Sequence, residues 1–157
     1  MEITSTGNVL VIAWHGNATL EVVTRLEEAS LQLARGHRAI AHLNVVSQAD
    51  RPAPMDEAAR TRIIALLRDP AHRLAASATV FGDGGFVSAA IRGVLAGLAL
   101  VAGTRAKVRF LPRLEAATAW LRTCLAEAGA PAPTDAELIA AADLVLRIAR
   151  TRSTSSS

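Results

Sequence analysis

The sequence predicts an α/β fold with a mostly parallel sheet of four or five strands, alternating helices and one extra helix at the C-terminus. Four short apolar runs carry the expected strands, and they span residues 8–14, 38–46, 75–82 and 107–112. Stretches with apolar residues at helical spacing separate these runs. Because such stretches are too long to be hairpin turns, the strands should lie in one direction and be joined by right-handed crossovers.

The first strand, residues 8–14, is apolar at both parities, so other elements should cover both of its faces. Residues 1–6 can add a short antiparallel edge strand before it. A helix should follow over residues 17–36, where apolar residues recur at helical spacing. Thr19 is its expected N-cap, and Gly36 is expected to end it.

The second strand, residues 38–46, has two different faces. His42 and Asn44 make one face polar, which indicates either a polar patch or small pocket, or the solvent side of an incompletely covered sheet. After a loop with two prolines, a helix should begin near Asp56. The Asp69–Pro70 pair should end it, because a residue before proline avoids the helical region. The apolar face of the strand consists of Ala39, Ala41, Leu43 and Val45.

The same alternation continues in the C-terminal half. A helix over residues 85–102 should follow the third strand, and an amphipathic helix over residues 113–129 should follow the fourth. Cys124 lies on the expected inner face of the second of these helices, beside Leu121 and Leu125. It is therefore interpreted as a small buried hydrophobe and not as a reactive thiol.

A last helix is expected over residues 134–150. Thr134 should cap it, and Glu137 stands at the capping-box position three residues later. Residues 1–150 are predicted to form a single domain of common size. The serine-rich residues 151–157 are predicted to be a disordered tail.

Composition narrows the range of functions. Apolar residues make up 51% of the 157 residues, enough for a core, and the formal net charge is 17 − 14 = +3. All basic residues except Lys107 are arginines, and the chain has no tyrosine. An arginine- and alanine-rich composition of this kind is typical of a GC-rich coding sequence. Because no basic stripe alternates with aromatic residues, we expect no nucleic-acid partner.

The chain also lacks patterns that hold metals or cofactors. Cys124 is the only cysteine, so neither an intramolecular disulfide nor a multi-cysteine metal site can form. The four histidines are not paired at i,i+4 and include no H-E-x-x-H pattern. We expect no metal site and no cofactor, we identify no catalytic residue, and a reducing cytoplasm is compatible with the single thiol.

Two segments can be compared with a targeting signal and a membrane span, and the sequence argues against both. The N-terminus carries Glu2 and no basic residues, unlike a signal peptide. Residues 86–103 are apolar and about as long as a short membrane span. Arg92 stands near their middle, and a central arginine costs roughly 2.5–3.5 kcal/mol on insertion. We therefore expect a buried helix of a soluble domain and no membrane span.

A glycine cluster comes after the third strand at Gly82, Gly84 and Gly85. A dinucleotide-binding fingerprint would need a third glycine where Val87 stands, and a P-loop would need a lysine. Asp83 would place a carboxylate against a phosphate. The cluster is therefore interpreted mainly as a tight strand-to-helix corner.

The order of the strand and helix segments, and parts of their sequences, nevertheless resemble a known family. The strand "VLVIAWHG", the helix start "ATLEVVTRL" and the strand "AIAHLNVV" are followed by "ASATVFG…GFVSAAIRGVLAG" and "KVRFLPRLEAATAWL". Together they are similar to the STAS or SpoIIAA-like domain, over about residues 7–126. A short last strand ending in phenylalanine and a helix with an "EA…WL" signature correspond here to Phe110, Glu115, Ala116, Trp120 and Leu121.

The resemblance implies a bacterial cytoplasmic regulatory or interaction module without catalysis. Anti-sigma-factor antagonists of this family carry a phosphorylatable serine in a D-S-x-G stretch. At that place this chain reads "NVVSQADRPAPMDEAAR", in which Ser47 is the only serine and no D-S-x-G occurs. A phosphorylation switch of the usual kind is therefore not expected. The extra helix over residues 134–150 also goes beyond the family's core pattern.

These observations support two functional hypotheses. The first is a non-enzymatic regulatory or scaffolding domain that binds a protein partner, or itself, through a sheet edge and the helix after the second strand. Its expected contact residues are Gln48, Asp50, Arg51, Arg60 and Arg62. The alternative is a small-molecule or nucleotide-binding domain, whose site would lie at the carboxyl ends of the parallel strands. Its expected residues are His15, Ser47, Gly82, Asp83, Gly84, Gly85 and Arg92.

Overall fold

The computed structural model describes residues 1–46, 55–81, 93, 96–97, 100 and 103–155. Its centre is a five-stranded sheet in the order β1-β2-β3-β4-β5. The edge strand β1 runs antiparallel to β2, and the other neighbours are parallel. The predicted α/β fold, including the antiparallel strand at the N-terminus, is confirmed. The strands are β1 (Glu2–Thr6), β2 (Val9–Trp14), β3 (Ile40–Val46), β4 (Leu74–Phe81) and β5 (Lys107–Leu111).

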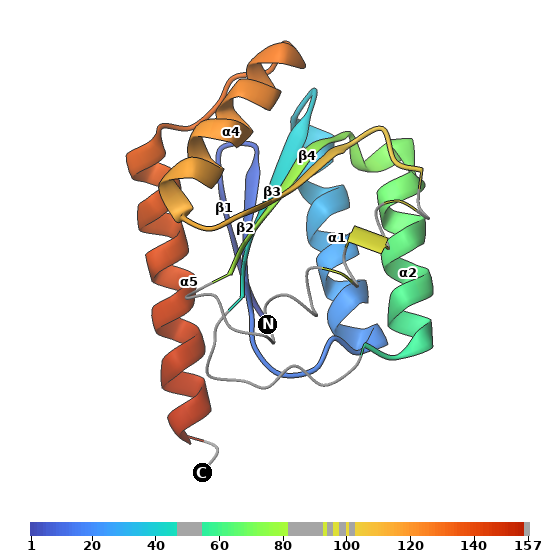
Figure 1. The fold of residues 1–157 in the computed structure, drawn as a ribbon, viewed down its shortest axis with the longest axis vertical. Coiled ribbons are helices and arrows are strands. Elements are labelled where there is room, and N and C mark those ends of the chain that lie inside the picture. Colours follow the sequence, from blue (N-terminus) through green and yellow to red (C-terminus); the bar gives the residue numbers. More distant parts are fainter. Residues whose placement is uncertain (47–54, 82–92, 94–95, 98–99, 101–102, 156–157) are drawn as a thin grey trace.

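Helices cover the two faces of the sheet in separate layers (Figure 1). The helices α1 (Leu20–Gly36) and α2 (Glu57–Arg68) lie on one face, and α4 (Leu114–Glu127) and α5 (Asp135–Ser155) lie on the other. A short 3₁₀ turn, η1 (Pro70–His72), joins α2 to β4. Most of the predicted helix over residues 85–102 lies outside the described residues. Within the described part of the chain, no helix has the length and apolarity needed to span a membrane.

The two faces of the sheet differ in their cores. Alternate strand residues, including the predicted apolar face of β3, pack against α4 and α5 in one large cluster. Val11, Leu43, Leu121 and Leu125 are fully buried there. The cluster on the other face is smaller and contains Leu10, Ile12, Leu26 and Leu66 with Met1.

The last helix is longer than the sequence predicts. It continues to Ser155, past the expected end at Arg150, and so includes residues expected in the tail. Near its end, Arg152 donates a hydrogen bond of 2.6 Å to Oε1 of Glu2, whose side chain is mostly buried. The helix packs along β1 and β2 (Figure 1), and this ion pair attaches its C-terminal turns to the N-terminal strand.

The capping box of α5 forms as the sequence predicts. The backbone N–H of Glu137 donates to Thr134 Oγ1, and the backbone N–H of Thr134 donates to Glu137 Oε2. The carboxylate of Glu137 accepts from the backbone N–H and from the hydroxyl of Thr134, and these two bonds lower the pKa of the Glu137 carboxyl. Two otherwise unpaired donors of the first turn are thereby satisfied.

Replacing Thr134 by alanine should lower the free energy of unfolding by about 1 kcal/mol, the usual cost of losing an N-cap side chain. Urea denaturation measures this change. Thr123→Ala is the matched control, because the Thr123 hydroxyl bonds back to the Ala119 carbonyl oxygen inside α4 and caps nothing. An equal effect of the two substitutions would contradict the capping role.

Candidate functional site

The residues predicted for a small-ligand site are largely outside the described part of the chain. Of these residues the structure describes only His15, which follows β2. The predicted residues that lie outside the described part are Ser47, Gly82, Asp83, Gly84, Gly85 and Arg92. His15 Nε2 lies 3.4 Å from Oε1 of Glu2, the same oxygen that Arg152 contacts. The sequence did not indicate this partner, because it depends on the antiparallel pairing of β1 with β2. The ligand-site hypothesis stays a prediction.

Among the residues predicted to contact a partner, Arg60 and Arg62 lie on α2, whereas Gln48, Asp50 and Arg51 lie outside the described residues. Arg60 is exposed. Both Nε and Nη2 of Arg62 lie 2.6 Å from Oε2 of Glu27 on α1. Arg62 therefore connects the two helices and also stands at the edge of a surface between them.

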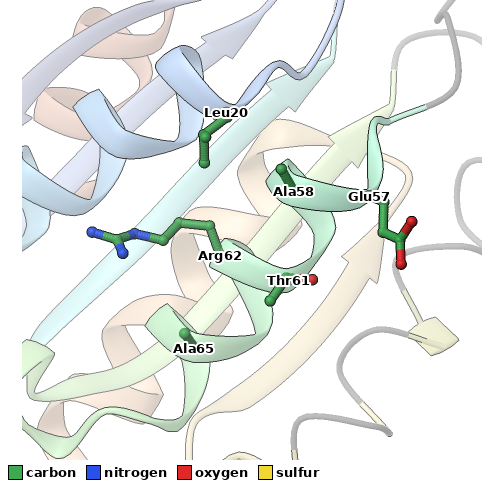
Figure 2. A pocket seen from close by; sticks show the side chains of 6 residues that line it. All are labelled: Leu20, Glu57, Ala58, Thr61, Arg62 and Ala65. Atoms are coloured by element: carbon green, nitrogen blue, oxygen red, sulfur yellow. The ribbon is translucent and has the colours of Figure 1, made fainter.

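An open depression of about 570 Å³ lies between the first turns of α1 and the length of α2. Leu20 reaches it from α1, and the other five lining residues come from α2 (Figure 2). Leu20 is 45% exposed and is one of the few large apolar side chains open to solvent among the described residues, together with Leu100 and Leu144. The lining residues are Leu20, Glu57, Ala58, Thr61, Arg62 and Ala65.

Local sequence explains the shape of this depression. Thr19 and Asp56 cap the two helices by accepting bonds from the backbone N–H of Val22 and Ala59. Both helices begin at the same edge of the sheet, because α1 follows β2 and α2 follows the parallel strand β3. The small residues of α2 that line the depression recur at helical spacing along one exposed face. They leave room beside Leu20 that larger residues would fill.

The lining is suited to a protein side chain more than to an enclosed small molecule. Sites for small ligands usually bury most of the ligand and place a few polar groups around it. Here the lining residues of α2 are exposed, Leu20, Ala58 and Ala65 are apolar, and the charged side chains of Glu57 and Arg62 point away from one another (Figure 2). An apolar surface flanked by polar and charged side chains is the usual pattern of a protein interface.

A buried serine–histidine pair lies beneath α1. Ser30 Oγ and His42 Nε2 are 2.9 Å apart, a distance that also occurs between a catalytic nucleophile and its base. The Ser30 hydroxyl, however, donates its one proton to the Leu26 carbonyl oxygen at 2.9 Å, so His42 Nε2–H must be the donor to Ser30. Ser30 is also fully buried. The pair therefore fastens α1 to β3 and does not activate a nucleophile.

Burial controls the charge of His42. It lowers the pKa of His42 to about 3, and the neighbouring His72 acts in the same direction. His72 is also fully buried, and within the described residues neither of its ring nitrogens has a hydrogen-bond partner. Its Nδ1 lies 3.8 Å from Oδ2 of Asp69. His42 is therefore neutral in the folded protein over the ordinary range of pH.

The polar face of β3 is buried and internally bonded. Trp14 Nε1–H donates to Asn44 Oδ1 at 3.0 Å, and Asn44 Nδ2 donates to Ser77 Oγ and to the Ala78 carbonyl oxygen at 3.1 and 3.2 Å. Asn44 is 8% exposed and His42 is 3% exposed. Of the two interpretations of this face, the solvent side of the sheet is wrong, and a polar patch is correct.

Cys124 lies in the large core cluster, as the sequence predicts. Burial raises the pKa of its thiol. A raised pKa keeps the thiol protonated, and a protonated thiol is a weak nucleophile and a weak metal ligand. Within the described ranges, no three or more histidine, cysteine or carboxylate side chains gather as a metal ion would require.

No protein-family model matches this chain. No curated protein and no solved structure matches it either. What the structure establishes is the fold, an α/β fold with a mixed five-stranded sheet.

Proposed function

We propose that this chain is a non-enzymatic regulatory or scaffolding domain that binds a protein partner, or a second copy of itself, in the bacterial cytoplasm. The surface between α1 and α2 is its contact site. The observation that carries this proposal is the open depression lined by the exposed Leu20 of α1 and by Ala58, Thr61 and Ala65 of α2, with the charged Glu57 and Arg62 beside them.

The proposed kind of module is STAS-like or SpoIIAA-like. Support comes from the segment that carries the resemblance, since β5 contains Phe110 and is followed by a turn and then by α4. In α4, Leu121 is fully buried and Trp120 packs against the large core cluster. The guanidinium carbon of Arg109 lies 5.8 Å from the centre of the Trp120 ring. Trp120 of the motif thus contacts the last strand through Arg109.

A charge placed in the depression should abolish binding through it. Ala58→Arg puts a guanidinium beside Leu20, and desolvating it in an apolar contact should weaken the complex by at least about tenfold. The wild-type chain and the variant are compared by native mass spectrometry and by pull-down from the lysate of the source organism.

Ala140→Arg is the matched control, because Ala140 is an exposed alanine on α5, on the opposite side of the sheet. It should leave the complex intact. A wild-type chain that stays monomeric and recovers no partner would refute the proposal, as would equal binding by the Ala58→Arg and Ala140→Arg variants.

A further inference from the structure

One edge of the molecule concentrates exposed arginines. They stand where β3, β4 and β5 begin and where α1 and α2 end, and all are exposed. We call this surface the basic edge. It consists of Arg35, Arg38, Arg68, Arg73 and Arg105.

Three hydrogen bonds to backbone carbonyl oxygens bring these residues together from distant parts of the sequence. The N–H of Ile40 donates to the Arg73 carbonyl oxygen at 3.0 Å, and Arg73 Nη1 donates to the His37 carbonyl oxygen at 3.0 Å. Thr104 Oγ1 donates to the Leu67 carbonyl oxygen at 2.7 Å. The first two contacts place Arg73 beside Arg35 and Arg38, and the third places Arg105 beside the end of α2.

Among the described residues, few carboxylates offset this charge. Asp69 stands among these arginines, and its Oδ1 already accepts a bond from the Ala71 N–H. The nearby Glu127 is paired with Lys107, and Asp135, on the α4–α5 side of the same end, is paired with Arg122. Five arginines and Asp69 give 5 − 1 = +4, whereas the whole chain carries +3. The rest of the sequence therefore has a slightly negative net charge, and the net positive charge of the chain lies at the basic edge.

Helix capping explains only part of the cluster. Arg35 and Arg68 stand in the last turns of α1 and α2, where a cation stabilises the carbonyl end of a helix. Arg38, Arg73 and Arg105 stand in the connections that lead into strands, outside any helix. Capping accounts for neither Arg38 nor Arg105, whereas Arg73 Nη1 donates to the carbonyl oxygen of His37, the C-cap residue of α1.

We propose that the basic edge binds an acidic segment of a partner protein. Arginine guanidinium groups bind carboxylates through paired N–H donors. Three exposed arginines before the neighbouring strands β3, β4 and β5 therefore suit a row of aspartates or glutamates. A nucleic acid is a poorer fit, because the described aromatic rings nearest the arginines belong to the body of the fold and none stands among them for base stacking. The inference rests on the proposed function only in taking the partner to be a protein.

Fluorescence anisotropy of a labelled oligoglutamate peptide tests the proposal with the full chain. The variant R38Q/R73Q/R105Q should bind it about tenfold more weakly, as expected for three exposed charge contacts. The control R25Q/R147Q/R150Q removes the same net charge from exposed positions elsewhere and should change binding by less than about twofold. R38Q/R105Q keeps the Arg73 bond to His37 and should show an intermediate loss, which separates binding from folding.

Three results would overturn the inference: no binding of oligoglutamate by the wild-type chain at low salt, an equal loss in the triple variant and its control, or tighter binding of duplex DNA than of oligoglutamate through the same arginines. The Ala58→Arg variant should bind oligoglutamate normally, because its substitution lies at the other end of α2. A loss of partner binding at the depression can therefore be distinguished from a loss of oligoglutamate binding at the basic edge.

Discussion

As the pH falls from 6.5 towards 3, the free energy of unfolding should decrease because of His42. Its pKa is lowered to about 3 in the folded chain and has the ordinary histidine value of 6.5 in the unfolded chain. Between these values the unfolded chain binds a proton that the folded chain does not, so the stabilisation is complete above 6.5 and is lost as the pH falls. The slope can reach about 1.4 kcal/mol for each pH unit.

The variant His42→Gln isolates this contribution. Glutamine cannot titrate and can still donate an N–H towards Ser30, so the stability of the variant should depend less steeply on pH in this window. Urea denaturation at several values between about pH 7 and about pH 4 gives the two curves. His37→Gln is the control, because it makes the same exchange of side chains at a half-buried position at the end of α1. Parallel curves for the wild type and His42→Gln would show that His42 is protonated inside the fold.

Local patterns were enough to predict most of the fold. The predicted caps Thr19 and Thr134 act within one helical turn, and both bond as expected. Asp56, predicted only as the start of a helix, also caps that helix. The alternation along residues 38–46 assigned one face to the large core, because side-chain direction in a strand depends only on parity. The η1 turn was not predicted, because Asp69–Pro70 indicates a helix end and does not specify the conformation of the next residues.

The side-chain pairs within the fold could not be predicted in the same way. Asn44 bonds to residues 30 and 33 positions away, and Arg152 bonds to Glu2 across 150 positions. Such pairs depend on strand register and on which helix covers a face, and neither is encoded within a short window. The ion pair of Arg62 with Glu27 likewise required the packing of α2 against α1.

The basic edge has a signal in the sequence, although the low net charge conceals it. Arg38, Arg73 and Arg105 each stand within two residues of the start of a strand. Since parallel strands begin at one edge of a sheet, the predicted fold already implied that these arginines lie together. They were not predicted as a cluster, because a total charge of +3 does not show how charge is distributed.

Replacing Asn44 by alanine should lower the free energy of unfolding by about 2–4 kcal/mol. The substitution removes three hydrogen bonds, and it leaves the partly buried Trp14 indole N–H and the buried Ala78 carbonyl oxygen without Asn44 as a partner. Asn17→Ala is the control, since Asn17 is exposed before α1 and its loss should cost less than about 0.5 kcal/mol. Urea denaturation detected by tryptophan fluorescence measures both variants. Equal costs for the two would mean that the Asn44 bonds contribute nothing.

Asn44→Asp separates hydrogen bonding from burial. A carboxylate can still accept from Trp14 but cannot donate to the Ala78 carbonyl oxygen, and it places a charge at a position that is 8% exposed. At neutral pH this variant should therefore be less stable than Asn44→Ala. Burial raises the pKa of a carboxyl, so acid should protonate Asp at this position in the folded chain and narrow the difference between the two variants. A difference that stays constant from neutral to mildly acidic pH would mean that the carboxylate reaches water, and that the polar face of β3 is open at Asn44.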